Sequence, residues 1–251
     1  MPSWEVHRNL TKAAISKLGI TLNKEIYNGL FEGIIDPDKV PDKVLWTYIT
    51  KSGRVRISTS YTTHHEPFKN LINYYFNLSL YYLRKGDEFK AGFMLGRALH
   101  YIQDGALSKK RYFIFNIHNE EEKIMNEYAK NPQYIEILCK NININNKRKS
   151  SKAKEAICIA FKKSMDILNH FIEESKKSVN VYELKKTIRK IRIIKALIIA
   201  IFTLPIIINP FFNILTFPII CIIIFFRPKI YYEAMKAGII ILKPISIEPA
   251  Y

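Results

Sequence analysis

The chain has 251 residues and a formal net charge of +17, which leaves room for one sizeable domain with an appended segment. Its three cysteines, Cys139, Cys158 and Cys221, share no short spacing. That pattern excludes a CxxC metal knuckle and an even disulfide framework, and it favours a reducing compartment. The positive charge is local, because residues 140–195 hold 16 Lys and Arg against 5 Asp and Glu.

The N-terminal part of the chain predicts a helix followed by an acidic loop. The helix covers residues 4–18, ends at Gly19 and carries His7 as a candidate metal ligand. Residues 33–42 contain two prolines and cannot continue as a helix, so they predict a stiff loop. Acidic loops are usually solvated turns, but Asp36 also offers a carboxylate oxygen of the kind that metals bind.

The next segment leads into a predicted core helix. Residues 51–63 alternate weakly between apolar and polar and predict either a short hairpin or a loop. His64 and His65 then precede a helix that begins near Phe68 and repeats its apolar residues at intervals of three and four. Side chains at the start of a helix are exposed and can be aimed at a shared site, so both histidines are candidate ligands.

Two pairs of candidate ligands follow at helical spacing. His100 and Asp104 are four residues apart, and so are His118 and Glu122. Residues at this spacing lie on the same face of a helix, so each pair can direct two ligands at one ion. A lone pair of this kind is more often only hydrogen-bonded, but two pairs with histidines upstream favour metal binding.

The helix that carries His100 also has two glycines on one face, Gly92 and Gly96. Glycine weakens a helix interior, but it allows another backbone to come close. We therefore expect a neighbouring helix to pack tightly there, as a site assembled from several helices requires.

The second half of the chain changes in composition. Residues 196–226 form 31 consecutive residues without a charge and predict a membrane-embedded segment. Its internal prolines and the basic residues on both flanks favour a hairpin that enters and leaves on one side, with one tilted span as the alternative. The remaining parts are predicted as a basic Asn/Lys/Ser-rich linker, amphipathic basic helices and a C-terminal tail, at residues 140–155, 156–195 and 227–251.

The order of these candidate ligands over roughly residues 1–130 resembles the zinc-dependent phospholipase C family, whose all-helical fold is shared by the S1/P1-type nucleases. The resemblance implies an all-α fold, with a multi-helix phospholipase C-like metal-binding domain over residues 1–139 and a C-terminal membrane-embedded helical segment. The metal-ligand sets that it implies are Asp36, His64 or His65, His100 and Asp104; His118 and Glu122; and His7 with Asp104.

Two departures from the family pattern bear on the number of metal ions. The family usually has a further histidine shortly after the Asp, but none occurs between His100 and His118. Its secreted members also use the free amine of an N-terminal Trp, whereas Trp4 is internal here. We therefore expect one or two zinc ions rather than three. Asp36 can alternatively act in catalysis, as the general base that orients a zinc-bound water.

The resemblance implies a zinc-dependent phosphodiester hydrolase that acts on phospholipids at a membrane surface, with membrane lipid as its partner. The alternative is a non-catalytic membrane-anchored protein that keeps the fold and a partial metal site. An S1/P1-type nuclease ranks below both, because the matching half carries a net charge of only +4, so no nucleic-acid partner is expected. An HD-type phosphohydrolase is disfavoured because the chain has no His-Asp dipeptide. No protein partner is inferred, and we expect membrane attachment with the N-terminal domain in the cytoplasm.

Overall fold

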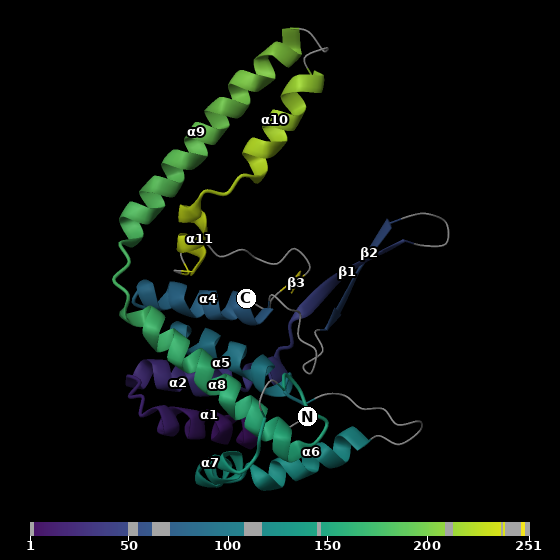
Figure 1. Cartoon of the computed structure of the whole chain (residues 1–251), viewed down its shortest axis with the longest axis vertical. Helices are drawn as coiled ribbons and strands as arrows, with labels where there is room; N and C mark the ends of the chain where they lie inside the picture. The colour runs from purple at the N-terminus through teal and green to yellow at the C-terminus, as the bar shows by residue number, and fades with distance from the viewer. Residues whose placement is uncertain are drawn as a thin grey trace. The chain divides into compact units, whose positions relative to one another are not determined.

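The structure is a computed structural model that describes residues 3–49, 55–61, 71–107, 117–144, 147–208, 213–236, 238 and 247–248. The described chain is mostly helical, in agreement with the all-α expectation (Figure 1). It divides into two compact units. Unit 1 comprises residues 1–177 and 241–251, and unit 2 comprises residues 178–240.

Unit 1 contains the predicted ligands and most of the secondary structure. Its helices are α1 (Trp4–Leu18), α2 (Lys24–Gly33), α3 (Asp36–Lys39), α4 (Leu71–Arg84), α5 (Glu88–Asp104), α6 (Ile117–Tyr128), α7 (Pro132–Lys140) and α8 (Ala153–Lys176). Its strands are β1 (Lys43–Ile49), β2 (Val55–Tyr61) and β3 (Ile247–Glu248).

Helix α5 is the centre of unit 1, and glycines bring α2 against it. A Cβ atom on Gly92 would lie 2.1 Å from the carbonyl oxygen of Ile26, and one on Gly96 would lie 2.4 Å from that of Leu30. On the α2 side, a Cβ atom on Gly33 would lie 2.0 Å from the carbonyl oxygen of Phe93. No side chain fits at such distances, so the predicted close approach of another backbone is confirmed. It brings the C-terminal end of α2 to the end of α5 that carries His100.

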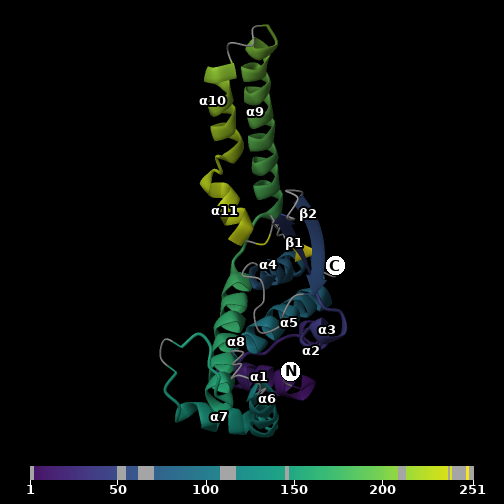
Figure 2. The same ribbon diagram turned by 90° about the vertical axis from the view of Figure 1, so that its right-hand side faces the viewer.

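Helix α8 closes the core of unit 1. It runs obliquely across α1, α4 and α5 (Figures 1 and 2). The predicted apolar stripe is the reason, because Ile157, Phe161 and Leu168 are all buried. The compact unit that contains the predicted ligands therefore continues to residue 177, whereas the predicted metal-binding domain ends at residue 139.

The predicted linker, residues 140–155, is tied to this core over its described part. The backbone N–H of Ser150 donates to the carbonyl oxygen of Ala106 at 2.9 Å, and Lys147 pairs with Glu155 at 2.8 Å. The segment was predicted as a linker because its residues are polar. Polar composition does not reveal which of these residues form specific hydrogen bonds with the folded unit.

A disulfide joins Cys139 on α7 to Cys158 at the start of α8, with 5.2 Å between their Cα atoms. The cysteine spacing did not predict this bond. Two cysteines pair when the fold brings their Cα atoms within about 4.4–6.8 Å, and a separation of 19 residues says nothing of that distance. Cys221 is the free cysteine.

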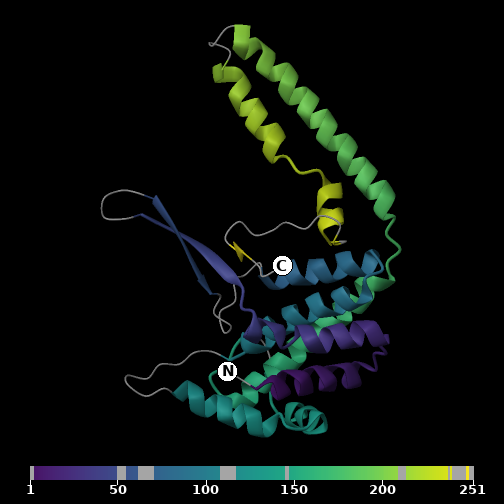
Figure 3. The ribbon, with the colours of Figure 1, turned by 180° about the vertical axis from the view of Figure 1, so that it is seen from behind.

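A small sheet is the exception to the helical fold. β1 and β2 pair antiparallel, with Lys43 opposite Tyr61 and Ile49 opposite Val55, and β3 pairs with the other edge of β1. The ribbon of β1 and β2 extends away from the helices of unit 1 (Figures 1 and 3). Within residues 51–63, for which a short hairpin or a loop was expected, residues 55–61 form β2, and its partner β1 lies before that range.

Unit 2 contains α9 (Val181–Ile208), α10 (Asn213–Phe225) and α11 (Lys229–Lys236). Helices α9 and α10 lie side by side and run in opposite directions (Figures 1 and 2). Over the part of the chain that the structure describes, no helix combines the length and the apolar character that crossing a membrane requires. The membrane-embedded segment at residues 196–226 stays a prediction.

Candidate metal centre

Two histidines from different helices meet in the core of unit 1. His7 lies in the first turn of α1 and His100 lies one turn before the end of α5. Their ring centroids are 4.6 Å apart, and both side chains are buried. They are 93 residues apart in sequence, so only the packing of α1 and α5 brings the rings together.

Asp104 faces both histidines with one carboxylate. Its Oδ1 lies 3.3 Å from Nε2 of His7, and its Oδ2 lies 3.3 Å from Nε2 of His100. The second distance confirms that the four-residue spacing puts His100 and Asp104 on one face of α5. Asp104 is fully buried. A buried carboxylate that turns one oxygen to each of two imidazoles is well placed to share in a metal site.

Asp38 completes the cluster from the short helix α3. Its Oδ1 lies 3.7 Å from Nε2 of His100. Among the described residues, one ligand atom each from His7, Asp38 and His100 lies within 4.8 Å of the other two, which is close enough for one ion to contact all three. The Asp38 side chain is 7 % exposed, whereas those of His7, His100 and Asp104 are exposed by 1 % or less.

The outer nitrogen of each histidine is held by a neighbour, and this fixes the nitrogen that faces the site. Nδ1 of His100 lies 2.9 Å from the carbonyl oxygen of Ile34, which can only accept, so Nδ1 carries the proton. Nδ1 of His7 lies 2.9 Å from Oε1 of Gln103. Both Nε2 atoms therefore point at Asp104 in the tautomer that metal-bound histidines use.

Gln103 is oriented by two further hydrogen bonds. Its Nε2 donates to Oγ1 of Thr11 at 3.0 Å and to Oγ of Ser164 at 3.1 Å, so its oxygen must face His7. The network links α1, α5 and α8 and is buried throughout. Sequence reasoning missed Gln103, and the only signal for it was its position directly before Asp104.

The cluster shifts the pKa of the two imidazoles in opposite directions. Burial pushes the pKa of His7 down, but the charge of Asp104 and the hydrogen bonds that Asp104 and Gln103 accept from the ring outweigh it, so the pKa is raised above 6.5. Burial dominates at His100, helped by the charge of His7, and lowers its pKa despite Asp104. Without an ion, His7 therefore holds its proton beside Asp104 more tightly than an ordinary imidazole does. A cation can replace that proton.

A buried arginine holds the segment of residues 36–42, which contains α3 and Asp38. The guanidinium of Arg97 pairs with Asp36, with Asp42 at 3.0 Å and with the carbonyl oxygen of Val40 at 3.2 Å. Asp42 also accepts hydrogen bonds from the hydroxyls of Tyr75 and Tyr101, each at 2.5 Å. These contacts fix both ends of the segment from residue 36 to residue 42, and Asp38 lies between them.

The burial of the two tyrosines has an electrostatic consequence. Burial raises the pKa of Tyr75 and of Tyr101, and the charge of Asp42 raises both further. Both phenols are therefore neutral donors to Asp42.

The predicted ligands fall into three groups. His7, His100 and Asp104 come together as expected. Asp36 is placed differently: it pairs with Arg97, and Asp38 lies beside His100 instead, because the α3 turn directs residues two apart to different neighbours. The acidic segment did contain a carboxylate that faces His100, but its residues 36–39 form the short helix α3 rather than part of a loop, and sequence could not choose between its aspartates.

The other predicted ligands lie outside the described part of the chain. His64 and His65 are outside the described residues. His118 and Glu122 lie on α6, but their side chains are outside the described ones. The predicted second ion site therefore stays a prediction.

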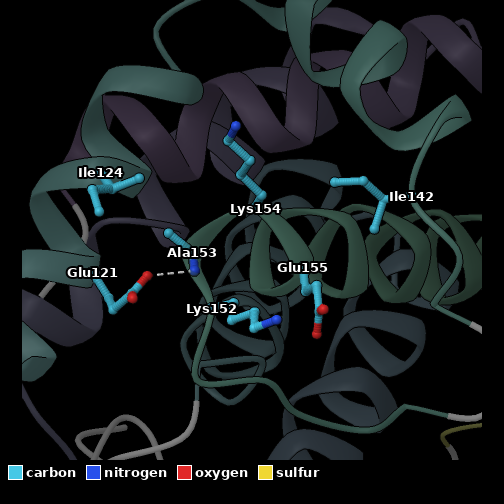
Figure 4. A pocket seen from close by; sticks show the side chains of 7 residues that line it. All are labelled: Glu121, Ile124, Ile142, Lys152, Ala153, Lys154 and Glu155. Atoms are coloured by element: carbon cyan, nitrogen blue, oxygen red, sulfur yellow. Dashed lines mark hydrogen bonds between the residues drawn. The ribbon is translucent and has the colours of Figure 1, made fainter.

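A pocket of about 350 Å³ lies elsewhere in unit 1, between α6 and the start of α8 (Figure 4). Glu121 occupies one side of it and accepts a hydrogen bond from the backbone N–H of Ala153 at 2.6 Å (Figure 4). Glu155, on the other side, is held by Lys147 and Ser150. The lining includes none of the residues of the metal cluster, and its acidic groups act in capping α8 and in local pairing.

Comparisons of the chain with protein-family models, with curated proteins and with solved structures found no match in any of the three. The resemblance to the zinc-dependent phospholipase C family therefore rests on the residue pattern alone.

Proposed function

We propose that this protein is a zinc-dependent phosphodiester hydrolase. The observation that carries the proposal is the buried group of His7, Asp38 and His100, completed by Asp104. Two imidazoles and carboxylates are a ligand set that zinc prefers. Nε2 of His7 supports the assignment, because this buried nitrogen lies 3.3 Å from Oδ1 of Asp104 and faces the same carboxylate as Nε2 of His100.

The protein groups would contribute in distinct ways. A zinc ion bound there would supply an activated water and positive charge for a phosphoryl oxygen. Asp104 would keep the two imidazoles in position for the ion. Ile34 would hold the ring of His100, and Gln103 that of His7, so that the Nε2 atom of each ring faces the ion. Asp38, the least buried carboxylate of the cluster, is the candidate for orienting the water. It takes the role that the sequence assigned to Asp36.

Phospholipid is the proposed substrate class. This part of the proposal rests on the resemblance to the phospholipase C family and on the apolar, basic character of residues 185–229. Nucleic acid is disfavoured because the half of the chain with the ligands carries little net charge.

One observation favours the alternative of a structural ion in a non-catalytic protein. The side chains of His7, His100 and Asp104 are each exposed by 1 % or less. A catalytic zinc keeps one position open to water, whereas a structural zinc is closed by protein. The two functions share the ion and differ only in turnover.

Metal content and turnover of the full chain test both. We expect about one zinc bound per chain at this cluster, by mass spectrometry, and its loss in His100→Ala and Asp104→Asn. His170→Ala is the matched control and should keep the zinc, because the His170 ring stacks on Phe76, outside the cluster. A folded protein without metal would end the proposal. Zinc without cleavage of phosphatidylcholine vesicles would leave the structural alternative, and preferential cleavage of single-stranded DNA would replace lipid by nucleic acid.

A further inference from the structure

Unit 2 is basic at one end and free of charge at the other. The first part of α9 exposes a group of basic side chains: Lys185, Lys186, Arg189, Lys190 and Arg192. After Lys195 the helix carries no charge to its end at Ile208, and α10 carries none at all. Unit 2 holds nine Lys and Arg against two Glu, so its basic end has few acidic partners.

The apolar parts of α9 and α10 start at the same level. The ammonium of Lys195 donates to the carbonyl oxygen of Phe226 and lies 6.0 Å from the centroid of its ring. Lys195 is the last charge on α9 before the apolar part, and Arg227 is the first charge after α10. Because the two helices lie side by side, this contact sets both charge boundaries next to each other (Figure 2).

Large apolar side chains of this part point outward. Those exposed by 59 to 78 % are Leu197, Ile201, Phe217, Ile222, Phe225 and Phe226. Packing between α9 and α10 does not cover them. So many large apolar side chains exposed on one pair of helices are rare on soluble proteins, since each Å² of apolar surface in water costs about 25 cal/mol.

We infer that the α9–α10 hairpin inserts into one leaflet of an anionic membrane, up to the level of Lys195 and Arg227. Residues 196–208 and α10 each span 13 residues, or about 20 Å, against about 30 Å for a hydrocarbon core. The basic part of α9 then continues along the same helix axis from the level of the lipid phosphates toward the solvent, where its charges attract anionic headgroups.

The charge of the hairpin selects the membrane over a second copy of the chain. In a dimer through the apolar part, the basic groups beside Lys195 would meet their equivalents and repel them. Anionic lipid neutralises the same groups. The inference does not depend on the metal cluster, so either can fail without the other.

Insertion is tested with a fluorophore on the full chain. Cys221 lies within α10 and is the free thiol, so an environment-sensitive maleimide dye reports on that helix. We expect a blue shift on vesicles of phosphatidylcholine with phosphatidylserine. The control carries the dye at Glu183→Cys in a Cys221→Ser background and should show no shift, since residue 183 is at the basic end. No shift at Cys221, or a cross-linked dimer in place of vesicle binding, would overturn the inference.

The basic groups are tested by partition into vesicles. The test variant replaces three exposed lysines of α9 by glutamine: Lys185, Lys186 and Lys190. Each basic residue near an anionic surface contributes about fivefold to the partition coefficient, so we expect a loss of about a hundredfold. A matched variant replaces three exposed lysines of unit 1: Lys17, Lys24 and Lys130. An equal loss in both variants would mean that the partition coefficient depends only on net charge. That result would contradict the assignment of lipid binding to the basic part of α9.

The one-leaflet geometry has its own test. Lys190→Cys and Lys229→Cys, each in a Cys221→Ser background, should both react with a membrane-impermeant maleimide added outside the vesicles, because both boundaries lie on one side. Protection of residue 229 alone would indicate a crossing and would overturn the hairpin.

Discussion

The two units treat polarity in opposite ways. Unit 1 buries charged groups, namely Arg97, Asp42, Asp104 and two histidines, and gives each a specific neighbour. Unit 2 exposes large apolar side chains such as Ile222 and Phe225. Either choice raises the free energy of an isolated soluble chain unless something compensates. In unit 1 the compensation is internal, through paired charges. In unit 2 the compensation that we propose is an anionic membrane.

The largest expected effect breaks the buried charge network of unit 1. Arg97→Met removes the guanidinium from Asp36 and Asp42 while keeping much of the side-chain volume. Removing one partner of a buried ion pair costs about 3–5 kcal/mol, because the other charge stays buried. Urea unfolding followed by circular dichroism measures this loss.

The exposed pair of Lys90 and Asp87, at 3.1 Å, is the matched control. Lys90→Met should change the free energy of unfolding by less than about 1 kcal/mol, because exposed pairs contribute little. Similar losses in both variants would contradict the assignment of Arg97 to a buried network.

A smaller effect concerns pH and the metal cluster. The pKa of His7 is raised and that of His100 is lowered. At a pH between these two pKa values the metal-free site holds one proton, on His7, and this proton must leave when a cation binds. Zinc affinity should therefore rise about tenfold per pH unit in that window and level off above the raised pKa of His7. Competition with a fluorescent zinc chelator at several pH values measures the slope.

In the metal-free protein, the contribution of His7 to the stability of the folded state should fall as pH rises, whereas zinc affinity should increase. A raised pKa stabilises the folded state below the unfolded pKa of 6.5, and this contribution is lost as pH rises through the higher folded pKa.

The variant His7→Asn cannot be protonated at this position, so it should flatten the pH dependence of zinc affinity between the two pKa values. If zinc binding to the unaltered protein released two protons in this pH range, the opposite pKa shifts of His7 and His100 would be contradicted.

The smallest expected effect lies in unit 2. Ile222 is 68 % exposed, so Ile222→Ser should change the free energy of unfolding by less than about 0.5 kcal/mol. Leu99→Ala, in the core of unit 1, removes a fully buried side chain and should cost about 2–5 kcal/mol. Thermal unfolding of both variants in the absence of lipid compares them directly, and a large loss in Ile222→Ser would indicate that the apolar surface of α10 is covered within the protein.

Several features were predictable because they depend on local periodicity. The four-residue spacing of His100 and Asp104 puts them on one face of any α-helix. Gly92 and Gly96 predicted the close approach of a backbone, which proved to be that of α2. Features that depend on distant contacts were not predictable. The spacing of Cys139 and Cys158 did not reveal their bond, and composition did not reveal that α8 packs into the core of unit 1.

What the sequence determined by itself is therefore the helical character, the shared face of His100 and Asp104, and the long stretch without charge at residues 196–226. Only the tertiary structure decided that Asp38 rather than Asp36 faces His100, and that Gln103 orients His7. The physical reason is range. Helix periodicity acts over four residues, whereas the neighbour of a buried side chain depends on how whole helices pack.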